Sequence, residues 1–274
     1  MKERPKLGRG LEDISRYFLS GTAERDRERH EDLSPVLKVR SFGVCHPGSA
    51  LIQSCFLANL ALELARRRHD VVIHDFFTAE EVRVRTLMHG ILTEDGIRPD
   101  KTVVRLYGLP EIVISEKESE GVPSSEDTPG SELRPFDDAK DKYHLINIPS
   151  SLDFVLGNDT ISEYILLTMT DESSLLRSYA FIKAMSKKSG TPGIHVVFDD
   201  TPTQEDADRI LSRFLGFIEN HLGCMVSYLG RLIQEEQLHL SIRQQSPLVL
   251  FHGNSVAKDS ITGIFSRLLD GALV

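Results

Sequence analysis

Four side chains that could do chemistry stand at the ends of two apolar segments. Cys45 and His46 end the first segment, and His74 and Asp75 end the second. Thiol, imidazole and carboxylate groups that meet in space can bind a metal ion or activate a thiol. These residues lack the spacing of metal-binding motifs, and His and Cys at strand ends are usually structural. We therefore predict no metal site, and no catalytic pair stands at a motif spacing.

The elements around these residues predict a parallel sheet. The apolar segment 39–44 leads into a Pro-Gly-Ser turn, then an amphipathic segment, 51–68, and a second apolar segment, 71–73. A strand, a helix and a strand in this order close as a right-handed crossover. Ligands of such sheets bind beyond the carboxyl ends of the strands. The turn 46–54 therefore takes the position of a phosphate loop.

The rest of the chain continues the alternation of strand and helix. Strand patterns stand at 102–106, 111–114, 143–148, 163–168, 194–198 and 225–229. Helical patterns stand at 82–92, 173–187, 204–222, 234–243 and 255–269, and Gly230 is predicted to form a turn. This alternation predicts an α/β fold with a doubly wound, mostly parallel sheet and helices on both faces.

Two segments differ in character from the predicted domain, 38–274. Residues 1–37 carry Leu7, Leu11, Ile14 and Phe18 at helical spacing, followed by the charged run 24–32. They predict a short helix on a solvated linker. The segment 115–138 is rich in Ser, Glu, Asp, Pro and Gly, and we expect an acidic disordered loop there.

The charge and cysteine content limit the function classes. Acidic residues outnumber basic ones by 41 to 32, and the net charge of −9 argues against binding nucleic acid by phosphate neutralisation. We expect protein partners instead. The sequence shows no signal peptide and no apolar run of roughly 18 residues, the length that spans a bilayer. Together with an odd count of three cysteines, this predicts a cytoplasmic protein with reduced thiols.

Several segments resemble, in order, the MinD/ParA family of deviant P-loop ATPases, and most closely its flagellar-number branch, FlhG (also called FleN). The resemblance covers roughly residues 39–269. Its segments are ANLALELARR (58–67), SYAFIKAM (178–185), VSYLG (226–230) and RQQSPLV (243–249). The resemblance implies a P-loop NTPase fold of the MinD/ParA type.

The phosphate loop of this family reads K-G-G-x-G-K-T, and its two lysines neutralise the phosphates. The corresponding stretch here is Gly48 to Ser54, and it includes Ser49. Gly48 and Gln53 stand at the two lysine positions, and Ile52 replaces a glycine. Ser54 keeps a hydroxyl that in the family reaches Mg²⁺, although such a serine more often caps a helix. The resemblance therefore implies a degenerate loop.

The other motifs of the family have also changed. Asp75 matches the first aspartate of a D-x-D motif, but Phe77 stands at the catalytic second position. Asn147 replaces the aspartate of I-D-T-P, which holds the Mg²⁺ shell in the family. Phe198 replaces an asparagine that faces adenine. The resemblance thus implies that most of the electrostatic stabilisation for phosphoryl transfer is lost.

These changes predict a non-catalytic regulator or scaffold in the spatial organisation of a machine such as the flagellum or the division site. We expect no cofactor and no hydrolysis. The alternative is a switch that binds ATP and Mg²⁺ unconventionally, through Ser54 and the remaining helix N-terminus. The residues of the vestigial nucleotide site are Gly48, Ser49, Gln53, Ser54, Asp75 and Asn147.

The expected partner is another protein, bound through Leu11, Ile14 and Phe18 of the N-terminal helix. A homodimer, or a heterodimer with an active relative, is a further expectation. A third hypothesis is membrane association through the apolar stripe at 261–269 of the closing helix, 255–269. We interpret that stripe as core instead, because this helix offers only Lys258 and Arg267 to anionic lipid.

Overall fold

The computed structural model describes residues 39–76, 83–92, 101–106, 108–116, 142–149, 151–157, 161–188, 192–199, 203–251 and 255–270. The chain divides into two compact units, Met1–Lys38 and Val39–Val274. The first unit lies outside the described residues, and with it the predicted helix that carries Leu11, Ile14 and Phe18. The second unit holds all of the described helices and strands.

Within the described residues, eight strands form one sheet in the order β3-β4-β2-β5-β1-β6-β7-β8. Neighbouring strands are parallel except β3 and β4, which are antiparallel. From β1 the chain builds one side of the sheet, returns to β5 beside β1, and then adds β6, β7 and β8 on the other side, which confirms the predicted doubly wound, mostly parallel sheet. The strands are β1 (Val39–Cys45), β2 (Asp70–Asp75), β3 (Lys101–Val104), β4 (Ile112–Glu116), β5 (Lys142–Asn147), β6 (Glu163–Thr168), β7 (Gly193–Asp199) and β8 (Ser227–Leu232).

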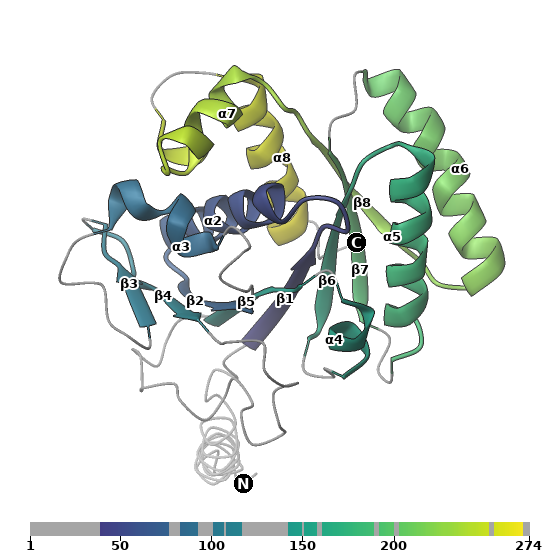
Figure 1. Ribbon diagram of the computed structural model, residues 1–274, viewed down its shortest axis with the longest axis horizontal. Coiled ribbons are helices and arrows are strands. Elements are labelled where there is room, and N and C mark those ends of the chain that lie inside the picture. The colour runs from purple at the N-terminus through teal and green to yellow at the C-terminus, as the bar shows by residue number, and fades with distance from the viewer. Residues whose placement is uncertain are drawn as a thin grey trace, which may run out of the picture. The chain divides into compact units, whose positions relative to one another are not determined.

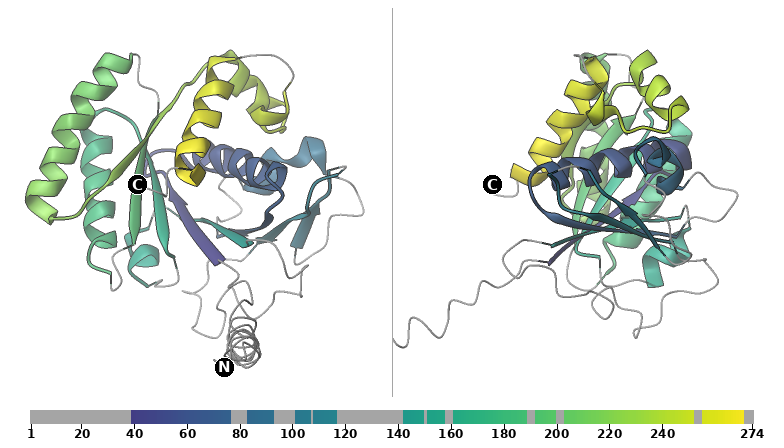
Figure 2. Two further views of the ribbon diagram at one scale, coloured as in Figure 1. Left: turned by 180° about the vertical axis from the view of Figure 1, so that it is seen from behind. Right: turned by 90° about the vertical axis from the view of Figure 1, so that its left-hand side faces the viewer.

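Helices cover both faces of this sheet, as predicted (Figure 1). One face packs against α2 (Ala50–Arg66), α3 (Val84–Leu87), α7 (Glu236–Arg243) and α8 (Val256–Asp270). The other packs against α4 (Leu152–Gly157), α5 (Glu172–Met185) and α6 (Gln204–Leu222). Seen from behind, α5 and α6 lie side by side over β6 to β8 (Figure 2). The sheet therefore separates two hydrophobic cores, each closed by its own helices.

The helix α2 is held firmly in the first core, which fixes the loop before it. Its N-cap is Ser49, whose hydroxyl accepts a hydrogen bond from the backbone N–H of Ile52 at 3.3 Å. In its middle, Phe56 packs edge-on against Phe265 of α8, with ring centroids 5.2 Å apart. Arg68 then turns the chain with a φ of 69° into β2.

The prediction of one helix over residues 82–92 is wrong in its second half. The chain forms only the short α3 and then a 3-10 turn, η1 (His89–Ile91). The reason is a close approach to the segment after α7: Gly90 N donates to Gln245 O at 2.9 Å. A Cβ on Gly90 would lie 3.1 Å from that carbonyl oxygen, so any larger residue would require the two backbones to move apart by a few tenths of an ångström. The sequence pattern also missed α4.

Two predicted boundaries shift as well. Gly230 does not form a turn but lies inside β8, where a β-bulge faces Val196 and Val197. Its φ of 136° is one that glycine adopts without strain. Ser115 and Glu116 continue β4, two residues into the predicted acidic loop. The loop from residue 117 to 138 lies outside the described residues.

The apolar stripe of α8 belongs to the core. Ile261, Ile264, Phe265 and Leu268 are at most 2% exposed and pack with α2. The stripe is therefore already covered by the domain. No helix among the described residues is long and apolar enough to cross a membrane.

Candidate functional site

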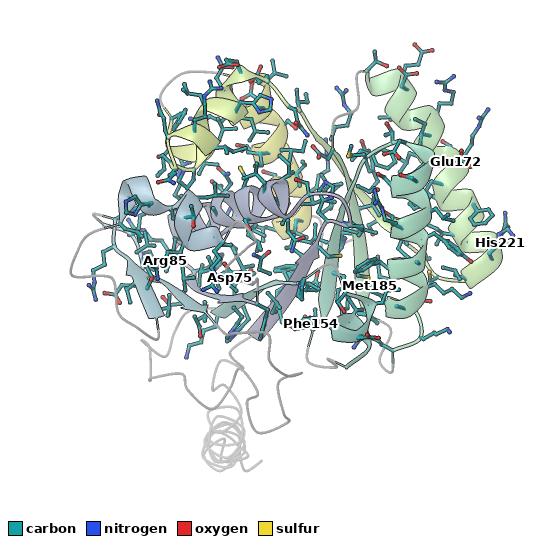
Figure 3. All side chains as sticks on the ribbon, in the orientation of Figure 1. Asp75, Arg85, Phe154, Glu172, Met185 and His221 are labelled. Atoms are coloured by element: carbon teal, nitrogen blue, oxygen red, sulfur yellow. The ribbon has the colours of Figure 1, made fainter. Side chains whose placement is uncertain are left out.

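The candidate site lies at the carboxyl ends of β1, β5 and β2, which are neighbours in the sheet. Asn147 ends β5 between Val44 of β1 and Asp75 of β2, its direct partners in the strand register. The loop from His46 to Ser49 follows β1 and leads into α2, whose first turns carry Gln53 and Ser54. Asp75 is labelled in Figure 3, below α2. The fold thus brings together the side chains that the sequence pattern had singled out.

Gln53 connects the loop to two strands. Its side chain is fully buried. Its Nε2 lies 2.8 Å from Val44 O, 2.8 Å from Asn147 Oδ1 and 2.7 Å from Ile148 O, so its two N–H groups share three acceptors. Its Oε1 accepts the backbone N–H of His46 at 2.6 Å. Every polar atom of this side chain is therefore engaged within the protein.

Asn147 carries the network on to the remaining carboxylate. Its Nδ2 donates to Asp75 Oδ1 at 2.9 Å and to Ser54 Oγ at 3.2 Å. The second carboxylate oxygen of Asp75 accepts the backbone N–H of Val84 at 2.8 Å. All four side chains, Gln53, Ser54, Asp75 and Asn147, are buried. They form one connected hydrogen-bond network in which Asp75 is the acidic member.

The side chain of His46 is bound by the backbone of its own loop. Its Nδ1 accepts the backbone N–H groups of Gly48 and Ser49 at 3.0 and 3.1 Å. A ring nitrogen that accepts two hydrogen bonds carries no proton, so the proton of the neutral ring is on Nε2. Nε2 then donates to Asp199 Oδ2 at 3.2 Å. Asp199 Oδ1 in turn accepts from Gln234 Nε2 at 2.7 Å.

The loop fits closely around this ring. A Cβ on Gly48 would lie 3.3 Å from Cε1 of His46. Both His46 and Asp199 are 1% exposed. The sequence pattern gave His46 only a possible role in a metal site, and it gave Asp199 and Gln234 none. The one signal available was the spacing of His46 from Gly48 and Ser49, two and three residues, which lets a side chain bind nearby backbone N–H groups.

The reactive residues at the strand ends do not gather into one cluster. Cys45 is fully buried, and burial raises the pKa of its thiol far above the usual range. His74 points to the sheet face opposite Asp75, where its Nε2 lies 3.0 Å from Nδ1 of His144. Burial, followed by the charge of Lys142, lowers the pKa of His144. In the described part of the chain no three His, Cys, Asp or Glu residues are placed to hold a metal ion.

A phosphate group does not fit the loop in this conformation. The N–H groups of Gly48 and Ser49 are engaged with His46, and Gln53 offers a neutral amide where the resemblance places a lysine. In the described part of the chain, the guanidinium of Arg177 lies beside the loop: its Nη2 is 3.7 Å from the position of a Cβ on Gly48. Phe77 lies outside the described residues, and Phe198 is fully buried in the second core.

No family model matches the sequence, and no curated protein is significantly similar to it. Solved structures do match the fold. A chain of the MinC:MinD cell division protein complex of Aquifex aeolicus has a TM-score of 0.60 at 13% identity, over 84% of this chain and 96% of that one. A ParA family ATPase from Chlorobium tepidum has a TM-score of 0.55 at 16% identity, over 85% and 98%.

A third similar structure carries a bound nucleotide. It is the septum site-determining protein MinD from Pyrococcus horikoshii complexed with Mg-ADP, with a TM-score of 0.58 at 13% identity, over 86% of this chain and 98% of that one. The expectation that this chain takes no cofactor is contradicted by such neighbours and is withdrawn. The topology and these matches together identify the fold of this chain as that of the MinD/ParA-type P-loop NTPases.

Proposed function

We propose that this chain is a regulator or scaffold of the MinD/ParA type that does not hydrolyse ATP at a useful rate. The observation that carries the proposal is the hydrogen bond from Gln53 to Asn147. By resemblance, these two residues stand where the family has a lysine and an aspartate. Phosphoryl transfer depends on positive charge at the phosphates and on Mg²⁺ held by carboxylates. Two neutral amides that bind each other supply neither.

The resemblance to the FlhG branch supports a role in placing a cellular machine such as the flagellum or the division site. It rests on the segments 58–67, 178–185, 226–230 and 243–249. We extend the proposal to a protein partner, because a similar MinD was solved in complex with MinC. The proposal also includes a homodimer of this domain, or a heterodimer with an active relative.

The N-terminal segment is the proposed attachment point, through Leu11, Ile14 and Phe18. The double variant Ile14→Asp with Phe18→Asp is expected to lose a partner captured by the full chain, without a change in melting temperature. A fall of several degrees would place the segment in the core of the domain. Since a similar ParA was solved bound to nonspecific DNA, a gel-shift assay belongs in the same series. We expect no shift, because the net charge of −9 opposes contact with phosphates.

The second candidate function is a switch that binds Mg²⁺ and nucleotide without rapid hydrolysis. It is favoured by the similar MinD that was solved with Mg-ADP. Within this chain, Ser54 offers a hydroxyl and Asp75 a carboxylate for the metal, and Arg177 offers a charge beside the loop. Both candidates share the absence of turnover, and they differ in whether bound nucleotide switches the state of the protein.

Two measurements on the purified full chain test these functions. Phosphate release from Mg-ATP is expected to equal that of a heat-denatured sample. Release that exceeds this background and is lost in Ser54→Ala would overturn both candidates, since neither includes turnover. Titration calorimetry with Mg-ADP then tests the second candidate, because saturable binding supports the switch and the absence of binding overturns it.

A further inference from the structure

The loop between β1 and α2 is closed by a side chain of its own. The N–H groups of Gly48 and Ser49 both point at Nδ1 of His46, at 3.0 and 3.1 Å. Adjacent backbone N–H groups before a helix are the donors that bind phosphate oxygens in phosphate loops. Here the lone pair of an imidazole takes the place of an anion oxygen. An anion and the ring of His46 would therefore compete for the same two donors.

The ring is fixed from its other side. Nε2 donates to Asp199 Oδ2 at 3.2 Å, and Gln234 fixes the other oxygen of that carboxylate at 2.7 Å. Asp199 ends β7 and Gln234 follows β8, so both partners come from the sheet half beyond β6. Among the described residues, Asp199 holds the ring, and Arg177 of α5 lies beside Gly48. The ring is locked between the loop and this second half of the sheet.

We propose that the His46 side chain is an autoinhibitory occupant of the loop, and that an oxyanion binds there only when this side chain leaves. The inference rests on the proposed function, since it concerns the regulation of the same loop. Removal of the ring frees both N–H groups and opens the space next to Gly48. Arg177 then supplies the positive charge that the loop itself lacks. Hydrolysis does not follow from this opening, because Gln53 and Asn147 remain neutral.

A matched pair of variants tests the proposal. His46→Ala removes the acceptor, whereas His46→Asn keeps an acceptor oxygen near the position of Nδ1. The probe is inorganic pyrophosphate, titrated into each full-length protein and followed by calorimetry. We expect His46→Ala to bind it at least about tenfold more tightly than the wild type, because two donors are released. His46→Asn is expected to stay close to the wild type. Equal affinity of His46→Ala and the wild type would overturn the proposal.

A measurement on the unaltered protein covers the case in which His46→Ala does not fold. Long-range ¹H–¹⁵N spectra of the wild type are expected to show His46 as the Nε2-protonated tautomer. Saturating pyrophosphate should shift both ring nitrogens together with the amides of Gly48 and Ser49. A ring signal that stays unchanged while the two amides shift would refute competition. ATP turnover, which would sink the proposed function, is a separate readout from either result.

Discussion

The side-chain amide of Gln53 donates to Oδ1 of Asn147 across 2.8 Å and so joins the first turns of α2 to the end of β5. A lysine at position 53 would place a cation at a site with no exposed surface. We expect Gln53→Lys to lower the free energy of unfolding by about 3 kcal/mol or more, because the charge is buried without a matched partner. Gln53→Met, which is neutral and similar in length, should cost only about 1–3 kcal/mol for its lost hydrogen bonds.

Addition of Asn147→Asp to Gln53→Lys should recover part of this loss. We expect a favourable coupling energy of about 1 kcal/mol or more between the two changes, because each supplies the charge that the other needs. Asn147→Asp alone would bring a second carboxylate to within hydrogen-bond distance of Asp75. Urea unfolding of the wild type, both single variants and the double variant gives the cycle. Strictly additive effects would show that the two positions do not form a pair.

Stability should depend on pH through Glu163. Burial tends to raise the pKa of Glu163, but hydrogen bonds from His195 and Arg40 and their charges bring the pKa below its usual value. A depressed pKa stabilises the fold above the pKa of the unfolded chain, and this contribution is lost as the pH falls through the folded value. Glu163→Gln should therefore cost about 1 kcal/mol at pH 7 and less at pH 3. Melting temperatures of the wild type and the variant at pH 7 and pH 3 check this prediction. An equal loss of stability at both pH values would contradict it.

Two glycines should respond in opposite directions to alanine. In β1, a Cβ on Gly43 would lie 2.6 Å from Cδ1 of Ile148 and 3.0 Å from Ile161, both in the core. Gly43→Ala is expected to cost about 1–3 kcal/mol through overpacking. In α6, a Cβ on Gly216 would meet nothing within 4 Å. Gly216→Ala should therefore add about 0.5–1 kcal/mol, since alanine is the better helix former. Chemical denaturation of both variants measures their free energies of unfolding. A loss of stability in Gly216→Ala would refute the prediction for that glycine.

The core position of α8 can be tested against membrane binding. Phe265 is fully buried against Phe56, whereas Val256 on the same helix is 57% exposed. We expect Phe265→Ala to cost about 3–5 kcal/mol and Val256→Ala to stay within about 0.5 kcal/mol of the wild type. Binding to anionic vesicles should be absent in the wild type. A vesicle-bound fraction that Phe265→Ala removes, with little loss of stability, would instead make the stripe a membrane contact.

Much of the fold was predictable from the sequence because its strands are short apolar runs between periodic helices. The resemblance grouped Gln53, Asp75 and Asn147 into one site, and the fold brings them together because the carboxyl ends of parallel strands meet at one edge. The bulge at Gly230 was not predictable, because a glycine there is equally consistent with a turn. The split of the helix 82–92 depends on Gln245, which is remote in the sequence from Gly90.

The role of His46 depends on a residue that no local pattern connects to it. Asp199 is 153 positions away, and their contact exists only because the loop after β1 and the end of β7 meet in the folded sheet. The same holds for Gln234, which follows β8 and fixes Asp199. Residue spacing can connect side chains within one helix, strand or loop. This network instead joins the loop after β1, the end of β7 and the segment after β8.

The neutral pair of Gln53 and Asn147 also governs which sequences this protein can reach by mutation. A charge introduced at position 53 alone is unpaired in the interior, and one introduced at position 147 alone faces Asp75. Each single step therefore passes through a less stable protein, although both steps together need not. A domain has only about 5–15 kcal/mol of stability in total, so such intermediates are readily lost. The pair that ties the loop to the sheet thus isolates this sequence, along single-substitution paths, from sequences with a charged loop.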